Sequence, residues 1–188
     1  TPSVSATTPT RPKRPPTQVQ LLDEAVSEAR SIVQRSPAWD YLAGRGVTPY
    51  TALVYGLGYG IPAPRVHREI IDAARQSMMV RRDGIWLWAG GVVYADPPTH
   101  PAVMNVRYIP EEQLPKGTRN FTPLKNHKTW GNRVQPLGSW RITPATRTLI
   151  VLEGLFDMLI TAQKIHQLGR EADTVAVYTN GASPSAKM

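Results

Sequence analysis

The stretch that most constrains the fold is residues 148–169, TLIVLEGLFDMLITAQKIHQLG. It opens with an apolar, partly β-branched run at 149–152, about the length of a buried parallel strand. Glu153 and Gly154 end this run, and the residues that follow have helical spacing. The side chains expected on one helical face are Leu155, Met158, Leu159, Ala162, Ile165 and Leu168. Gly169 stands where a helix C-terminus favours a left-handed residue, so the stretch predicts strand, turn and helix.

Two carboxylates mark the turn between this strand and this helix. Glu153 follows the strand at its C-terminal end, and Asp157 falls in the first helical turn. In open α/β sheets, ligands bind at the C-terminal ends of the strands. An acid near a helix N-terminus also stabilises the helix by about 0.3–1 kcal/mol without any chemistry. The residues alone leave both interpretations open.

The same stretch resembles the opening of a TOPRIM domain, the metal-binding fold shared by DnaG-type primases, topoisomerases and some nucleases. In that family a glutamate ends the first strand, and Glu153 occupies its place. The resemblance implies that Glu153 and Asp157 are catalytic. It also implies that Glu153 holds Mg²⁺ or Mn²⁺ together with an Asp-x-Asp pair on a later strand. No Asp or Glu follows Asp173, so we expect an incomplete metal site in this chain.

The net charge of +8 is concentrated in two segments. Residues 1–20 contain three cations and no acid, and residues 105–147 contain eight Lys or Arg side chains against two Glu. A localised basic excess is typical of proteins that bind phosphate groups. A solvated, solubilising surface accounts for the charge equally well.

Composition narrows the class of protein further. The sequence has no Cys, which excludes disulfides and thiolate zinc sites, so we expect no zinc in this chain. It has no apolar run of about 18 residues and no signal-like start, so we expect no membrane association and a cytoplasmic location. A hydrophobic content of 41% is sufficient for a core.

The N-terminal half predicts a linker followed by helices and strands. Residues 1–18, rich in Pro, Thr and Ser, are expected to be a disordered basic linker. Ser36-Pro37 and Thr48-Pro49 each place a capping residue before Pro, which predicts two short helices that end near residues 44 and 55. Further helices are expected at 19–34 and 64–79, a hairpin turn at 83–84, and extended segments at 56–60, 90–94, 102–109 and 175–178. Trp86, Trp88 and Tyr94 are interpreted as sheet core rather than as base-stacking groups.

Residues 38–60, AWDYLAGRGVTPYTALVYGLGYG, resemble an element at the start of the RNA-polymerase core of DnaG-type primases. The positions in register are Tyr41, Leu42, Arg45, Gly46, Gly58 and Tyr59. The resemblance implies that Arg45 belongs to a basic surface that handles template or nucleotide phosphates. The alternative for Arg45 is a cation that interacts with the carbonyls at a helix end.

A third resemblance lies at residues 104–132, where the primase core has a strand ending in arginine and then a loop with lysine, asparagine and a second lysine. The matching positions are Arg107, Lys116, Asn120 and either Lys125 or Lys128. The lysine-to-asparagine spacing is one residue longer than in the family, so Arg119 is an additional candidate. Guanidinium, ammonium and amide groups are suited to polyphosphate and sugar contacts.

The three resemblances occur in the family order, and together they imply a truncated DnaG-type primase core of the α+β class. We expect a helical and mixed α+β subdomain at 19–147 and the first part of an α/β TOPRIM fold at 148–188. The implied activity is RNA primer synthesis during replication on single-stranded DNA from ribonucleoside triphosphates, with a replicative helicase as a further partner. The loose match to the cellular pattern points to a phage or plasmid primase, and the fragment alone is expected to be inactive. A non-catalytic module that binds single-stranded nucleic acid or nucleotides, and a TOPRIM nuclease of another branch, are the alternatives.

Overall fold

The computed structural model describes residues 30, 33–60, 87–96, 98, 103–120, 126–130 and 136–179, and for residues 103, 104 and 126–130 it describes the backbone alone. Several expected features lie outside these residues. They are the linker at 1–18, most of the helix at 19–34, the helix at 64–79, the turn at 83–84, Trp86 and Lys125. The last described part of the expected first helix, Val33–Arg35, forms a 3-10 turn, η1.

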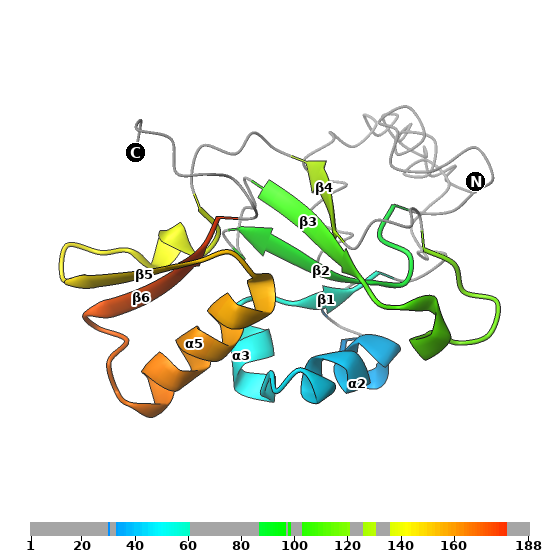
Figure 1. Cartoon of the computed structure of the whole chain (residues 1–188), viewed down its shortest axis with the longest axis horizontal. Helices are drawn as coiled ribbons and strands as arrows, with labels where there is room; N and C mark the ends of the chain where they lie inside the picture. The colour runs from blue at the N-terminus through cyan, green and yellow to red at the C-terminus, as the bar shows by residue number, and fades with distance from the viewer. Residues whose placement is uncertain are drawn as a thin grey trace, which may run out of the picture.

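An antiparallel sheet of four strands lies at the centre of the described structure, in the order β1-β2-β3-β4 (Figure 1). The strands are β1 (Gly58–Tyr59), β2 (Gly91–Asp96), β3 (Val103–Tyr108) and β4 (Asn126–Trp130). The sequence predicted the first three and missed β4. Trp88 and Tyr94 are almost completely buried, which confirms their assignment to the core. The Tyr108 hydroxyl donates to the Leu87 carbonyl at 2.7 Å, and burial raises the pKa of this tyrosine.

A parallel pair of strands joined by a helix forms the second unit. Strand β5 (Thr148–Leu152) leads into α5 (Leu155–Gln167), which returns the chain to β6 (Thr174–Tyr178). This arrangement confirms the strand, turn and helix predicted from the sequence, and Gly169 adopts the expected left-handed conformation, with φ of 66°. A single antiparallel bridge between Leu137 and Tyr178 lies on the other side of β6.

The burial expected for this unit was wrong in two places. Leu149 and Val151 of β5 are 49% and 50% exposed, whereas the sequence predicted a strand covered on both faces. Among the described strands, β5 pairs with β6 alone and lies at the edge of the sheet, so part of its surface stays accessible. Leu168 is 66% exposed because α5 ends at Gln167, and Leu168 is the C-cap residue beyond the buried face.

Two short helices precede the central sheet, as their capping signals predicted. Helix α2 (Pro37–Gly44) begins after Ser36, whose hydroxyl donates back to the Val33 carbonyl instead of capping the helix. Helix α3 (Pro49–Val54) begins after Thr48, whose side chain accepts a hydrogen bond from the backbone of Thr51. Of the helices in the described ranges, none is both long and apolar enough to span a bilayer.

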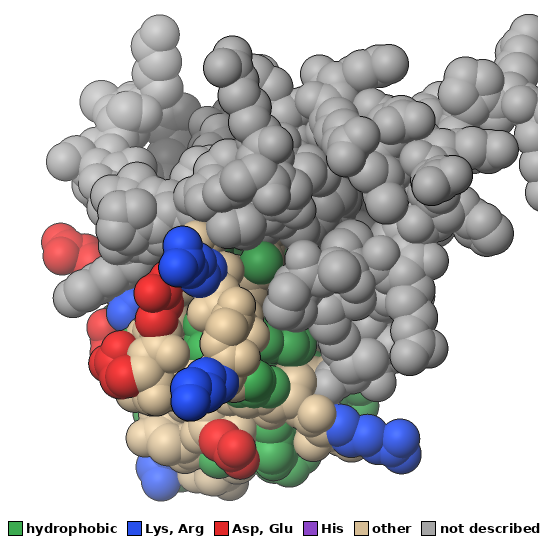
Figure 2. Space-filling model, turned by 90° about the vertical axis from the view of Figure 1, so that its right-hand side faces the viewer, with side chains coloured by type: hydrophobic (Ala, Val, Ile, Leu, Met, Phe, Trp, Pro, Cys, Tyr) green, Lys and Arg blue, Asp and Glu red, His purple; other side chains and the backbone are tan. Residues whose placement is uncertain are grey.

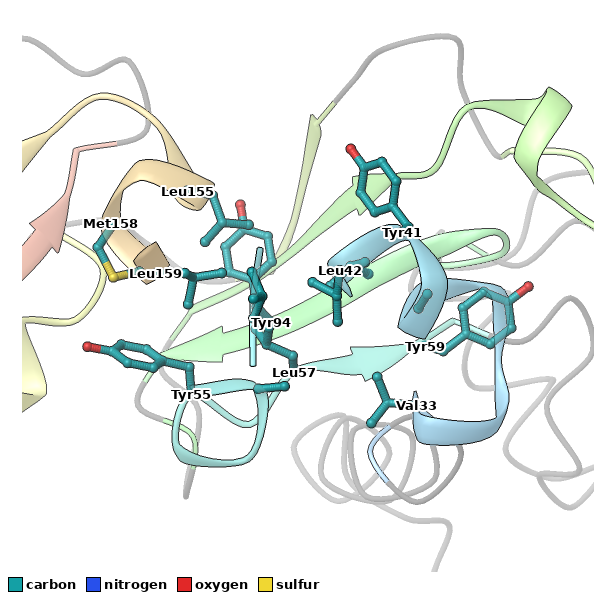
Figure 3. Close-up of a cluster of buried hydrophobic side chains, with 14 of the residues drawn as sticks. Val33, Tyr41, Leu42, Tyr55, Leu57, Tyr59, Tyr94, Leu155, Met158 and Leu159 are labelled. Atoms are coloured by element: carbon teal, nitrogen blue, oxygen red, sulfur yellow. The ribbon is translucent and has the colours of Figure 1, made fainter. Parts of the chain in front are cut away.

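The helices α2, α3 and α5 lie along one side of the two sheets in Figure 1. They cover one continuous cluster of buried side chains that draws on both sheets. In Figure 3, Leu155 and Leu159 of α5 point toward Tyr94 of β2, while Leu42 of α2 fills the adjacent space. Burial of each such side chain stabilises the fold by about 1.5–3 kcal/mol. Helix α5 is therefore packed against residues from both sheets, and its first turn is held at the junction between them.

Candidate functional site

The two predicted carboxylates lie at the junction between β5 and α5. Glu153 directly follows the last residue of β5 and is exposed, and Gly154 is the N-cap residue of α5. Asp157, in the first turn of the helix, is also exposed, and its carboxylate lies back against Gly154, close enough that a Cβ at this position would collide with it. The Asp157 carboxylate is therefore directed toward Gly154, the residue that follows Glu153. Both groups remain accessible to a ligand.

Arg45 reaches the same junction from the end of α2. Its Cζ lies 5.3 Å from the centroid of the Tyr41 ring and 5.2 Å from that of Phe156, which is the second residue of α5. The two rings are in edge-to-face contact at 5.6 Å. Within the part of the chain that the structure describes, no acidic side chain forms a salt bridge with Arg45, which is exposed. Its charge is therefore accessible to an anion.

Arg107 approaches the same aromatic pair from β3. Its Nε donates a long hydrogen bond of 3.4 Å to the Tyr41 hydroxyl, and its Cζ lies 5.9 Å from the Phe156 ring centroid. Figure 3 shows the hydroxyl of Tyr41 directed away from the other labelled side chains of the buried cluster. The fold thus gathers two guanidinium groups, from α2 and β3, around one ring of α5.

The distance from this ring to Glu153 is limited by the chain itself. Phe156 is three residues after Glu153, and an extended chain spans at most about 3.6 Å per residue, so their Cα atoms are within about 11 Å. The Phe156 Cα therefore lies near the Glu153 Cα, at the start of α5, and the ring that Phe156 carries contacts Arg45 and Arg107. Residues 41, 107 and 156 are far apart in the sequence, and the packing of α5 against α2 and β3 brings their side chains together.

The other predicted cations lie in and after the loop that follows β3. Lys116 and Arg119 are exposed in this loop, which begins with a 3-10 turn, η2 (Glu111–Gln113). The end of the molecule shown in Figure 2 carries acidic and basic side chains side by side around a few hydrophobic ones. The backbone register pairs Lys128 of β4 with Asn105, two residues before Arg107 on β3. The structure does not bring Lys116 or Arg119 into contact with the Arg45–Arg107 pair.

Asn120 forms hydrogen bonds within the loop that follows β3. Its Nδ2 donates to the Ile109 carbonyl at 2.9 Å, and its backbone N–H donates to Glu111 Oε1 at 3.0 Å. Its Oδ1 is buried against Gly90 and Leu114. In this structure Asn120 fixes the loop to the end of β3, and its amide faces the protein rather than solvent.

Arg141, which contributes to the basic excess, is internally paired. It lies 3.2 Å from Glu171, which is also 2.6 Å from His166, and Tyr50 stacks on the histidine ring with a centroid distance of 4.0 Å. These contacts are at the C-terminal end of α5, away from Glu153. Burial raises the pKa of the adjacent Tyr55, against the lowering effect of Arg141. This cluster is neutralised from within and is best explained as structural.

The carboxylates at the junction are suited to a divalent cation but are too few to hold it alone. Hard cations such as Mg²⁺ take about six oxygen ligands. Proteins usually supply at least one or two of these ligands as carboxylates. Glu153 and Asp157 provide such oxygens in accessible positions. Across the described ranges, no group of three or more metal-ligating side chains occurs. Part of the donor set for such an ion would have to come from outside these residues, from solvent or from substrate.

Comparisons with known proteins bear on the fold. No family model matches the sequence, and no curated protein is significantly similar to it. Among solved structures, a DnaG catalytic core matches with a TM-score of 0.65 and 19% identity, over 91% of this chain and 56% of that chain. The chain has the fold of a DnaG primase catalytic core.

Two further DnaG structures agree with this assignment. A DnaG primase catalytic domain bound to single-stranded DNA gives a TM-score of 0.63 at 19% identity, over 90% of this chain and 57% of that one. The E. coli primase catalytic core gives 0.61 at 18% identity, over 91% and 57%. The chain spans a little over half the length of these DnaG cores. The similarity confirms the predicted α+β class and the resemblance to a truncated DnaG-type core.

Sequence reasoning missed Phe156 as part of this candidate site. The helical pattern assigned the positions on either side, Leu155 and Asp157, to the core and to the carboxylate pair, and it left Phe156 without a role. The signal that could have identified it is its place between them. A large ring in the first turn of the helix must lie near the strand end that carries Glu153.

Proposed function

We propose that this chain is part of a DNA primase, in which the Arg45–Arg107 pair binds phosphate groups next to the carboxylates of Glu153 and Asp157. The observation that carries the proposal is the convergence of both arginines on Phe156, in the first turn of the helix that follows Glu153. The fold shared with DnaG cores supports it, and one of those cores is bound to single-stranded DNA.

The proposed reaction extends a primer on a single-stranded DNA template from ribonucleoside triphosphates. Each addition forms a bond between a 3′ oxygen and an α-phosphorus and releases pyrophosphate. Arg45 and Arg107 would bind phosphate oxygens through charge-assisted hydrogen bonds, which orient the phosphates and offset their negative charge. This cationic surface would extend along the bound DNA strand through Lys116, Arg119 and Lys128.

Glu153 and Asp157 are the residues that would hold Mg²⁺ or Mn²⁺, with donors from outside the described residues. Such an ion would neutralise charge on the transferring phosphoryl group. A replicative helicase as partner, and a phage or plasmid origin, belong to the same proposal and rest on the family resemblance alone.

One observation favours a second candidate function for the chain by itself. The described residues supply the arginine pair but only two carboxylates at the junction, so binding of single-stranded nucleic acid needs nothing further, whereas catalysis does. A non-catalytic binding module would use the same Arg45 and Arg107.

The first test measures binding of a fluorescein-labelled oligo(dT) strand by anisotropy, between about 50 and 200 mM salt. We expect weak binding that falls steeply with salt, because each neutralised phosphate releases counterions. Arg45→Ala and Arg107→Ala should each weaken binding and reduce the log–log salt slope by about 0.7. Lys164→Ala, which removes an exposed cation from the last turn of α5, is the matched control and should leave the slope unchanged.

Three results would contradict the proposed phosphate site. They are an absence of binding at low salt, binding that does not depend on salt, and equal effects of Lys164→Ala and the two arginine substitutions.

A further inference from the structure

Side chains from the end of α2 and from β3 meet the ring of Phe156, the second residue of α5. Phe156 is half-buried, and its ring contacts Tyr41 and Arg45 from α2 and Arg107 from β3. Both guanidinium groups lie within the limit of about 6 Å that defines a cation–π contact. The Phe156 ring therefore contacts two cations that come from separate parts of the chain.

The chemistry of these contacts is specific to an aromatic ring. Two guanidinium groups that lie close together repel each other, because neither can lose its proton and both stay positively charged. The negative π face of Phe156 attracts both, and a single exposed contact of this kind changes an equilibrium by about two- to five-fold. An aliphatic side chain would fill the same space against the core but would not attract either cation. Packing alone therefore does not account for a ring at this position.

The ring also limits the freedom of two long side chains before any ligand binds. An arginine that must be ordered during binding weakens the complex, because its rotamer entropy is then lost in the binding step. The hydrogen bond from Arg107 to Tyr41, and the edge-to-face contact between the two rings, restrict the same cluster further. Both guanidinium groups are thus partly ordered around the Phe156 ring before any ligand binds.

We propose that Phe156 is a positioning residue, which holds Arg45 and Arg107 together so that they engage one phosphate-bearing strand as a unit. This inference rests on the proposed function, because it takes the arginine pair as the phosphate site. It goes beyond that function in assigning the pairing of the two arginines to a side chain that does not itself contact phosphate.

The test compares aromatic and aliphatic substitutions at Phe156, with oligo(dT) as the probe. Phe156→Leu and Phe156→Met keep an apolar side chain and remove the ring, whereas Phe156→Tyr keeps the ring. We expect the first two to weaken binding by about five- to ten-fold, the effect of leaving one long side chain to be ordered on binding. They should also lower the salt slope. Phe156→Tyr should bind as the unsubstituted chain does, and thermal unfolding of all variants identifies any that fail to fold.

A double-mutant cycle separates positioning from packing. The effects of Arg45→Ala and Arg107→Ala on affinity should be coupled when Phe156 is present and additive when Phe156→Leu or Phe156→Met is also present. A residue with a merely structural role would lower the unfolding temperature without removing this coupling.

The outcomes distinguish the two proposals. If the arginine substitutions weaken binding but the aliphatic substitutions do not, or if coupling persists in their background, the role of Phe156 is overturned while the phosphate site stands. Equal losses from Phe156→Tyr and Phe156→Leu would also overturn it. If neither arginine substitution affects binding, the proposed function itself fails.

Discussion

Asn120 shows how a polar residue suited to a ligand can be used by the fold instead. Its amide nitrogen is bonded to the Ile109 carbonyl, and its oxygen is buried beside Gly90. Gly90 adopts φ of 73°, a conformation that side chains rarely tolerate, and a Cβ there would collide with Asn120 and with Leu114. The absence of a side chain at Gly90 is therefore what allows Asn120 to fix the loop.

Alanine at Gly90 tests this contact. We expect Gly90→Ala to destabilise the protein by about 1–2 kcal/mol for the left-handed backbone and by about 1–3 kcal/mol more for overpacking. Gly117 is the matched control, because its φ is 88° and nothing lies within 4 Å of its expected Cβ. Gly117→Ala should show the backbone cost alone. Urea denaturation measures both, and equal losses of stability would show that Asn120 moves aside without cost.

Gln163 of α5 forms three hydrogen bonds with the turn from α2 to α3 and the start of α3. Its Oε1 accepts hydrogen bonds from the backbone of Thr48 at 2.9 Å and from the Thr51 hydroxyl at 3.0 Å, and its Nε2 donates to the Gly46 carbonyl at 3.2 Å. Gly46 directly follows Arg45. Gln163 therefore joins α5 to Thr48 and Thr51 at the start of α3 and to Gly46, the residue after Arg45.

Substitution of Gln163 should affect both stability and binding. Gln163→Ala leaves the Thr48 N–H without its acceptor, and we expect a loss of about 1–3 kcal/mol in the free energy of unfolding. Gln163→Glu keeps the acceptor and loses only the donor to Gly46, so it should cost less. Lys164→Ala, at the next and exposed position, is the control for urea denaturation. A loss after Gln163→Ala no greater than that of the control would contradict this role.

The elements that the sequence predicted correctly are those with strong local signals. Ser36-Pro37 and Thr48-Pro49 define helix starts by capping and by the fixed φ of proline, and residues 149–157 switch from strand to helix spacing within a few positions. Strand β4, NHKTW, was missed because polar and aromatic residues do not alternate in it, and its pairing with β3 decides its conformation.

The residues of the candidate site also fall into those that local sequence signals identify and those that only tertiary packing reveals. The position of Glu153 at a strand end follows from its neighbours in the sequence. The contact of Phe156 with Tyr41 joins residues more than a hundred positions apart, so only the tertiary packing of α5 could reveal it. The subdomain boundaries at 19–147 and 148–188 stay a prediction.

At the scale of the whole chain, the prediction that it makes no primers by itself concerns the supply of metal ligands. The chain covers a little over half of the DnaG cores it matches, and within the described ranges Glu153 and Asp157 have no third metal-ligating neighbour. We therefore expect no incorporation of labelled ribonucleotides on a single-stranded template by this chain, with Mg²⁺ or with Mn²⁺. Glu153→Gln should leave oligo(dT) binding nearly intact, because the arginines supply the attraction.

Primer synthesis by the chain would show that two carboxylates suffice and would overturn this account of the metal donors. A large loss of oligo(dT) affinity in Glu153→Gln, with unchanged thermal unfolding, would instead assign Glu153 a direct part in holding the strand.

The buried cluster that the two sheets share has a consequence for how such a chain can be rearranged. Leu137, Leu155, Met158 and Tyr178 lie in the same cluster as residues of α2 and β2. The C-terminal unit therefore is not an exchangeable module. A recombined chain in which this unit followed an unrelated N-terminal part would need an apolar surface of matching shape in that part. We therefore expect the two parts to be inherited together.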